Sequence, residues 1–490
     1  MIKSSVISIL KTFSDEEVNS FTDFLNSPFH NKNENVIKLF VILKEYHPGY
    51  DDESLSKEKL FKRIFGNLKF KEYHIRNLFS DLNILAEKFL QFIHINANYT
   101  YEKLLIEEFN KRDIKEAMDK KIRLLEKKVN SEKSRDHQYY TNKVFVYEAK
   151  SFLTVDKTLT DNFRNEQLLS TIKFFMISIM EFYFYFIVEE QRVKIKHDFN
   201  FLKLMLNYIK EHLDEFKESP LLIIFYYLLS SFFEINNDEK YFLKAKTLFG
   251  KYFLILTKID QKNIYSVLQT YCINKIDKGI HSYNKELLGI LLEMLKFNVI
   301  SHKDTGNINI NLFRNILILC VTIKEINILK KFIGDYIKLV DPESRSSLSA
   351  YSYAHLDFLQ KNYEKALELC NKINFNDLLV TTNENLYFKN DIKKLMLVCL
   401  FELNSFENAM SLIDAYKHFL NNSRLMKEAS KEKTMNFINL VNELLKLKIN
   451  FDEFKLKKLK NKILQSNKIA NKDWILEKID ELAASGNYKR

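Results

Sequence analysis

The sequence predicts an all-α protein in which an array of α-helical hairpins follows an N-terminal cluster of helices. The first observation is the scarcity of turn formers, since only 8 of the 490 residues are glycine and 4 are proline. Soluble proteins usually contain about 7% glycine and about 5% proline. The second is that apolar residues recur at helical spacing in roughly twenty segments, joined by short polar loops. The third is a hairpin-like segment that recurs near the C-terminus.

Charge and cysteine content favour a soluble protein of a reducing cytoplasm. The chain carries 75 basic and 64 acidic residues, a net charge of +11. The two signs alternate along most segments, which is typical of solvated helix faces rather than of a nucleic-acid-binding surface. Four cysteines lie far apart in apolar runs, without a C-x-x-C motif: Cys272, Cys320, Cys370 and Cys399. This spacing indicates neither a disulfide framework nor a zinc site, and the N-terminus does not read as a signal peptide.

The first predicted domain, residues 1–95, is a compact cluster of helices. Ser14 and Glu17 form a capping-box pattern that begins one helix. The segment SPFHNKNEN is predicted to be a corner between two helices, and it begins with Ser27-Pro28, where a capping residue precedes proline. That order suits the first turn of a helix, because proline lacks the N–H group that is unpaired there. The same order predicts helix starts at two later positions: Ser219-Pro220 and Asp341-Pro342.

Residues 54–90 within this cluster offer an alternative function. Two predicted helices flank a turn at Gly66, and the second carries His74, Arg76 and Asn77, which is the arrangement of a helix-turn-helix. A DNA-binding module normally presents a clustered basic face, whereas acidic residues here dilute the lysines of both helices. The alternative function is therefore that of a nucleic-acid-associated transcriptional regulator.

The second predicted domain, residues 96–300, is an array of aromatic-rich helices. Its most apolar segment runs from Ile172 to Val188, 17 residues with Glu181 at the centre. A membrane-spanning helix needs about 20 residues and loses about 2.5–3.5 kcal/mol for a central charge. A helix that is apolar on all sides is more simply a buried helix of a large helical protein. We therefore expect no membrane span.

The third predicted domain, residues 301–490, contains the recurring hairpin and a terminal capping helix. The segment 353–373 aligns with the segment 395–416. The alignment superposes two pairs of residues at a spacing of 43: Tyr363 on Phe406, and Ala366 on Ala409. An aromatic residue after the turn fills the space between two antiparallel helices, and the small alanine lets their backbones approach closely. Stacked pairs of this kind bury faces that no single pair buries alone.

Weaker copies of the hairpin are present at 320–336, which aligns 37 residues earlier, and at 230–249. At these residues the chain resembles the tetratricopeptide repeats. Ala354 stands twelve positions before Ala366, where that family carries a small residue, but Leu397 occupies this place in the next hairpin. The spacings also depart from the family's period of about 34 residues. The resemblance therefore implies an irregular tetratricopeptide-like solenoid.

The whole chain is also similar to an uncharacterised family of bacterial helical proteins. The residues that carry this resemblance are TFSDEEVNSFTDFLNSPFHNKNENVIKLF near the N-terminus, FINLVNELLK and ANKDWILEKI near the C-terminus, and the hairpins between them. This second resemblance implies a fold and no particular activity.

The tetratricopeptide resemblance further implies a partner-binding groove, because that family lines its concave surface with the first helix of each pair. When the first helix of each pair is aligned with the family, the groove positions fall on two sets of residues: Leu348, Tyr351, His355, Phe358 and Leu359, then Asp391, Lys394, Val398, Phe401 and Glu402. We expect Tyr351 to anchor a partner protein or peptide, with Lys394 and Glu402 as charges at the rim. The competing interpretation is that the apolar members are core between repeats. The candidate partner-binding residues are Tyr351, His355, Asp391, Lys394 and Glu402.

The sequence carries no motif of catalysis, of a cofactor or of a metal. It has no glycine-rich phosphate loop, no nucleophile elbow and no pair of histidines at metal-binding helical spacing. His302 and Asp304 share a polar loop, which is one ligand short of a usable metal site. We therefore predict no catalytic residue, no cofactor and no metal. An enzyme whose site is assembled from distant helices is the remaining alternative.

A basic stretch at residues 448–468 has two interpretations. Its lysines are Lys455, Lys457, Lys458, Lys460 and Lys462. They either contact an acidic partner or a phosphate backbone, or they point outward from a terminal capping helix whose apolar stripe packs inward. Trp474, the only tryptophan, is expected to pack the last helix against the others. Taken together, these patterns predict a non-enzymatic adaptor or scaffold that presents a helical-repeat groove to another protein.

Overall fold

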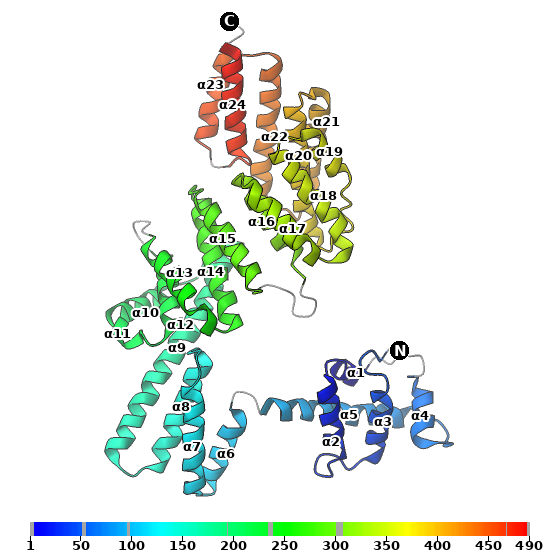
Figure 1. Cartoon of the computed structure of the whole chain (residues 1–490), viewed down its shortest axis with the longest axis vertical. Coiled ribbons are helices and arrows are strands. Elements are labelled where there is room, and N and C mark those ends of the chain that lie inside the picture. Colours follow the sequence, from blue (N-terminus) through cyan, green and yellow to red (C-terminus); the bar gives the residue numbers. More distant parts are fainter. Residues whose placement is uncertain are drawn as a thin grey trace. The chain divides into compact units, whose positions relative to one another are not determined.

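The computed structural model describes residues 4–50, 55–95, 99–193, 195–233, 239–299, 307–466 and 468–487. In these ranges the secondary structure consists of 24 α-helices and two short 3-10 helices, without strands (Figure 1). The predicted all-α class is confirmed. The chain forms two compact units, the first comprising Met1–Lys133 and His137–Phe174 and the second comprising Ser134–Asp136 and Phe175–Arg490.

The first unit begins with a five-helix cluster: α1 (Ser5–Leu10), α2 (Asp15–Asn26), α3 (Glu34–Lys44), α4 (Lys57–Phe65) and α5 (Glu72–Ile95). The long α5 packs against each of the other four helices. Aromatic rings fill the centre, where Phe21 lies 4.9 Å from Phe40 and 5.0 Å from Phe89 between ring centroids. Such edge-on and tilted pairs add to the free energy gained by burying the rings.

Two predicted helix starts in this cluster have different outcomes. The capping box is confirmed, because the Ser14 hydroxyl accepts from the backbone N–H of Glu17, whose carboxylate accepts from the N–H of Ser14. The Ser27-Pro28 pattern does not begin a helix, but the predicted corner between two helices is confirmed here. Ser27 follows the last residue of α2, and its carbonyl oxygen accepts from His30 and Asn31 to form a turn that contains Pro28. Asn33 caps α3 instead.

The rest of the first unit comprises α6 (Thr100–Lys111), α7 (Lys115–Asn130), α8 (His137–Leu153) and the beginning of α9 (Lys157–Val193), and α7 packs against both α6 and α8. Between α6 and α7 the chain turns at Asp113, which has a φ of 54°. The N–H of Ile114 then bonds to the carbonyl oxygen of Phe109 at 2.9 Å. This turn satisfies carbonyl groups that a helix end leaves unpaired.

The second unit begins with the later part of α9 and continues through short helices: α10 (Asn200–Glu211), α11 (Leu213–Phe216), α12 (Pro220–Ser230), α13 (Lys240–Tyr252), η1 (Phe253–Ile255), α14 (Lys258–Asp277) and α15 (Tyr283–Lys296). Pro220 is the first residue of α12, as predicted. The apolar α12 is central here, since it packs on α10, α13 and α14. Part of the 230–249 copy, residues 234–238, lies outside the described residues.

Helix α9 contains the apolar segment that we interpreted as a buried helix. Over Lys157–Gln191 it is long and apolar enough to cross a membrane by length and composition, and 33% of its most apolar window is buried within the protein. In the second unit its inner face is buried, including Ile177, Met180 and Phe184, whereas Phe182 and Tyr185 are exposed. The expectation of burial on all sides is therefore wrong, because other helices of the unit cover one face only.

The second unit ends with helical pairs and three further helices: α16 (Ile310–Thr322), α17 (Ile326–Tyr336), η2 (Ile337–Leu339), α18 (Pro342–Leu359), α19 (Tyr363–Asn371), α20 (Thr382–Glu402), α21 (Phe406–Asn422), α22 (Glu428–Ile449), α23 (Glu453–Leu464) and α24 (Lys472–Asn487). Asp341 caps α18 and Pro342 opens it, as predicted. Each of the pairs α16–α17, α18–α19 and α20–α21 packs together across a short turn.

The three turns share one geometry. Lys324, Lys361 and Asn404 each stand two residues after a helix end and have positive φ values of 57°, 63° and 56°. The N–H of the following residue bonds back to a carbonyl oxygen five residues earlier, as from Asn362 to Asp357 at 2.8 Å. This is a Schellman ending. The three turn residues are spaced by 37 and 43 positions, which are the spacings of the sequence alignment.

Candidate functional site

The five candidate partner-binding residues lie inside the second unit, in two separate polar clusters. Tyr351, His355 and Asp391 are buried, and Lys394 and Glu402 expose only 21% and 12% of their side chains. Tyr351 has no exposed surface. The expectation that it anchors a partner at an open groove is therefore wrong, because α18 and α20 use these faces to pack against one another.

Asp391 of α20 is the centre of the first cluster. Its Oδ2 accepts a hydrogen bond from the Tyr351 hydroxyl of α18 at 2.9 Å and one from Arg314 Nε of α16 at 2.7 Å. A second guanidinium nitrogen of Arg314 lies 2.6 Å from the same oxygen, and Lys394 Nζ lies 3.9 Å from Oδ1. The arginine also lies over the ring of Phe388, 5.6 Å from its centroid. One buried carboxylate thus joins α16, α18 and α20.

The titratable groups around Asp391 are shifted by burial. Burial lowers the pKa of His355 to about 4, so the ring is neutral at pH 7. Its Nδ1 lies 2.9 Å from the carbonyl oxygen of Tyr351 and must donate, because a carbonyl only accepts. Burial also lowers the pKa of Lys394, against the opposing effect of the Asp391 carboxylate. Burial, with Asp391 nearby, raises the pKa of Tyr351 well above its usual value.

Glu402 belongs to the second cluster, which holds α24 against α20. Its Oε1 accepts from the indole Nε1 of Trp474 at 2.9 Å and lies 2.9 Å from Lys478 Nζ. Burial lowers the pKa of Lys478, but the hydrogen bonds that its ammonium donates to Glu481 and Glu402 outweigh this effect and raise the pKa. The Trp474 ring lies 5.3 Å from that of Phe401, edge-on. Trp474 therefore packs the last helix down, as predicted.

The helix-turn-helix alternative concerns α4 and α5. Gly66 ends α4 with a φ of 67°, a conformation that glycine adopts without strain. Arg76 and Asn77 are exposed on α5 and His74 is partly buried. Acidic partners interrupt the basic residues, since Lys57 pairs with Glu72 at 2.5 Å and Arg63 with Glu45 at 2.8 Å. Within the described residues, these pairs break up the positive face that DNA binding normally requires.

The described residues show neither a cluster of metal-ligating side chains nor an exposed cysteine. Among the residues that the structure describes, no group of three or more His, Cys, Asp or Glu side chains is placed to hold a metal ion. His302 and Asp304 lie outside those residues. All four cysteines are free and buried. Burial raises the pKa of Cys272 and of Cys320 to about 12, so both are thiols at pH 7.

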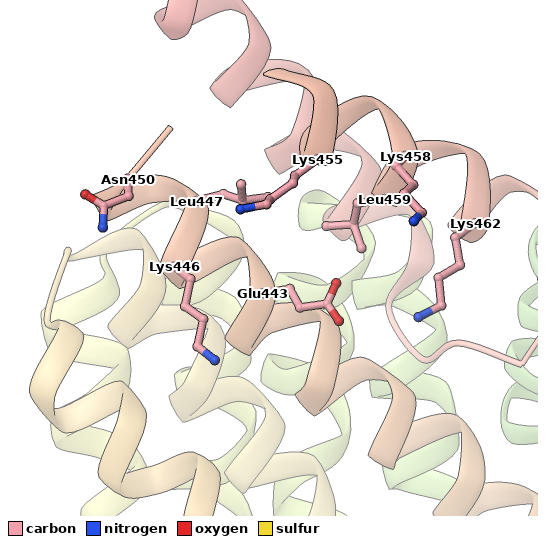
Figure 2. A pocket seen from close by; sticks show the side chains of 8 residues that line it. All are labelled: Glu443, Lys446, Leu447, Asn450, Lys455, Lys458, Leu459 and Lys462. Carbon is pink, nitrogen blue, oxygen red and sulfur yellow. The ribbon is translucent and has the colours of Figure 1, made fainter. Parts of the chain in front are cut away.

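A lysine-lined groove lies between α22 and α23 and includes part of the predicted basic stretch (Figure 2). Its volume is about 540 Å³, and it is lined by Glu443, Lys446, Leu447, Asn450, Lys455, Lys458, Leu459 and Lys462. Asp452 fixes the start of α23, because its carboxylate accepts from the backbone N–H of Lys455 at 3.0 Å. Both α22 and α23 pack on α24, and the groove opens between α22 and α23.

The groove places lysine side chains beside two leucines, and most of these lysines have no acidic partner among the described residues. Lys455 pairs with Asp452 at 3.3 Å. Lys446, Lys458 and Lys462 have no carboxylate within 4 Å in the part of the chain that the structure describes. The two leucines that line it are buried, Leu447 at 7% and Leu459 at 5% exposure. Such a surface suits an anionic partner that also carries apolar groups.

The sequence pointed to some of these residues. Lys455, Lys458 and Lys462 were visible as part of a basic helix, and they recur at helical spacing on one face. Glu443, Lys446 and Leu447 were missed because they belong to the preceding helix, which reads from its sequence as core. Comparison with known proteins finds no matching family model, no matching curated protein and no matching solved structure.

Proposed function

We propose that this chain is a non-enzymatic scaffold that binds another protein through the lysine-lined groove. The observation that carries the proposal is the groove itself, where three lysines without a carboxylate partner in the described ranges border two buried leucines. Elsewhere in the second unit polar groups are paired inside the fold, as Glu402 of α20 is with Lys478 of α24. Charged side chains held beside apolar surface are typical of sites where charge sets specificity and association rate.

The proposal extends to architecture and location. The hairpins α16–α17, α18–α19 and α20–α21 share one turn geometry and bury the alanines of the alignment, Ala366 and Ala409. This supports an irregular tetratricopeptide-like array, with α22 to α24 as its terminal cap. Four free buried cysteines fit a reducing cytoplasm. In this proposal the array is rigid support and the cap is the binding element.

The experiment is affinity capture of the intact protein from lysate of its own cells, followed by chemical cross-linking and mass spectrometry. Lys458→Glu is compared with Lys457→Glu, since Lys457 is the adjacent residue, does not line the groove and pairs with Glu453 at 2.8 Å. We expect a partner protein that cross-links to α22 or α23, is kept by Lys457→Glu and is lost with Lys458→Glu.

Two outcomes would contradict the proposal. A partner that both variants capture equally would show that the groove is not the binding surface. Captured material that disappears after nuclease treatment would identify a nucleic-acid partner and favour the helix-turn-helix alternative. Running the capture at low and high salt separates these cases further, because binding to a phosphate backbone weakens steeply with salt.

A further inference from the structure

The groove lysines of α23 form a row along the helix axis. Lys455, Lys458 and Lys462 stand at positions i, i+3 and i+7, so they share one face. With a rise of about 1.5 Å per residue, they follow one another at about 4.5 Å and about 6 Å along the axis. A second helix with carboxylates at the same spacing presents a matching row of negative charge.

The α22 wall of the groove is chemically mixed. Glu443, Lys446, Leu447 and Asn450 line it, and Figure 2 shows the Glu443 carboxylate between the two helices, with the ammonium groups of Lys446 and Lys462 on either side. A carboxylate in this position repels a chain of phosphates and accepts a hydrogen bond from a donor. Leu447 and Leu459, which are 7% and 5% exposed, form a narrow apolar floor that a phosphate backbone cannot use. The lining therefore favours a protein segment over nucleic acid.

More apolar surface lies exposed around the same helices. Ile449, Phe451 and Phe454, near the turn from α22 into α23, are 61%, 40% and 78% exposed, and Leu464 at the end of α23 is 54% exposed. A stable protein contact involves about 20–30 residues on each partner, which is more than the eight residues that line the groove. Of these exposed side chains, Phe454 stands four residues before Lys458 on α23, so it adds apolar surface beside the lysine row.

We propose that the groove binds an acidic amphipathic helix of the partner protein. Its carboxylates follow one another at single-turn spacing and face Lys455, Lys458 and Lys462. Its apolar residues lie on Leu447 and Leu459, and a basic or amide side chain donates to Glu443. This inference rests on the proposed scaffold function and names the chemistry of the element that the scaffold recognises.

The test uses the full-length protein and fluorescent probes of known composition. The first probe is a synthetic helical peptide of about 14 residues, or four turns. It carries glutamates at i, i+3 and i+7, leucines beside them and one lysine placed to face Glu443. The second peptide has the same composition in scrambled order, and the third probe is a single-stranded oligothymidylate of about the same length. Binding is followed by fluorescence anisotropy at two salt concentrations.

We expect the patterned peptide to bind at least about tenfold more tightly than the scrambled one, because only the first aligns its charges with the groove. Lys458→Glu should weaken its binding about fivefold to thirtyfold, since attraction becomes repulsion. Lys457→Glu should leave binding unchanged. Glu443→Gln should weaken the patterned peptide and strengthen the oligothymidylate. Circular dichroism of each variant checks that the helices are intact.

Three results would overturn the inference: equal binding of the two peptides, tighter binding of the oligothymidylate, or equal effects of Lys457→Glu and Lys458→Glu. The two proposals fail separately. If a cellular partner cross-links to the groove but the patterned peptide does not bind, the scaffold function stands and the helix chemistry is wrong. If the peptide binds as expected but no cellular protein cross-links to the groove, the recognition chemistry stands and the scaffold function is wrong.

Discussion

Replacing Asp391 by asparagine should destabilise the second unit strongly. The Asp391 side chain is 5% exposed and is the shared acceptor of Arg314 and Tyr351, and Lys394 Nζ lies 3.9 Å from its Oδ1. Asparagine keeps nearly the same shape and one oxygen acceptor but removes the negative charge. Two cations then lie next to one another without a counter-charge at this point. Removing one partner of a buried ion pair costs about 3–5 kcal/mol, and we expect the loss to lie in this range.

The assay is urea unfolding followed by the fluorescence of Trp474, the only tryptophan, which lies in this unit on α24 against Phe401. The control is Asp480→Asn, which removes a carboxylate from the exposed pair with Lys460 and should change the free energy of unfolding by less than about 1 kcal/mol. Adding Arg314→Met to Asp391→Asn should restore part of the loss, because it removes the uncompensated guanidinium. A loss no larger than that of the control would refute the reasoning.

Three further predictions use the same unit and urea unfolding. Because the pKa of His355 is about 4 in the folded protein and about 6.5 in an unfolded chain, the unfolded state binds one more proton between these values. Stability should fall by about 3 kcal/mol as pH is lowered from about 6.5 to about 4, and His355→Gln should flatten this dependence. Lys361→Gly should raise stability by about 0.5–1 kcal/mol by relieving a φ of 63°; a decrease would contradict the turn geometry. Trp474→Phe, followed by circular dichroism, should cost about 1–3 kcal/mol because Glu402 loses a buried donor; a neutral effect would show that solvent replaces it.

The turns of the last hairpins could be predicted from sequence because their signals are local. A Schellman ending needs one residue with positive φ between two helices, and an alignment of KNYEKAL with NSFENAM is enough to place Lys361 and Asn404 in equivalent positions. The Ser27-Pro28 pattern does not by itself place a helix start, for a related reason. The same two residues suit a helix start or a turn, and the cap that decides between them, Asn33, lies six residues further on.

The role of the hairpin faces could not be predicted, because it depends on how consecutive pairs stack. A first helix with Tyr351, His355 and Leu348 on one face lines a groove if neighbouring pairs diverge, and core if they pack closely. Nothing within α18 distinguishes these cases, since a tyrosine with a polar partner is equally suited to either. The structure resolves it through two residues that are distant in sequence from α18: Asp391 accepts from the buried Tyr351 hydroxyl, and Arg314 pairs with the same carboxylate.

This cluster also explains how hairpins with unequal spacing keep one register. Apolar contacts between stacked helices are non-directional, and leucine or phenylalanine faces shifted by one turn still bury similar area. A carboxylate that must meet Arg314 of α16 and the hydroxyl of Tyr351 of α18 can do so in one alignment of the three helices only. Any shifted alignment leaves a charge buried and unpaired, at a cost of several kcal/mol. We infer that Asp391 selects the stacking of the three hairpins, so that its loss should broaden the native state as well as weaken it.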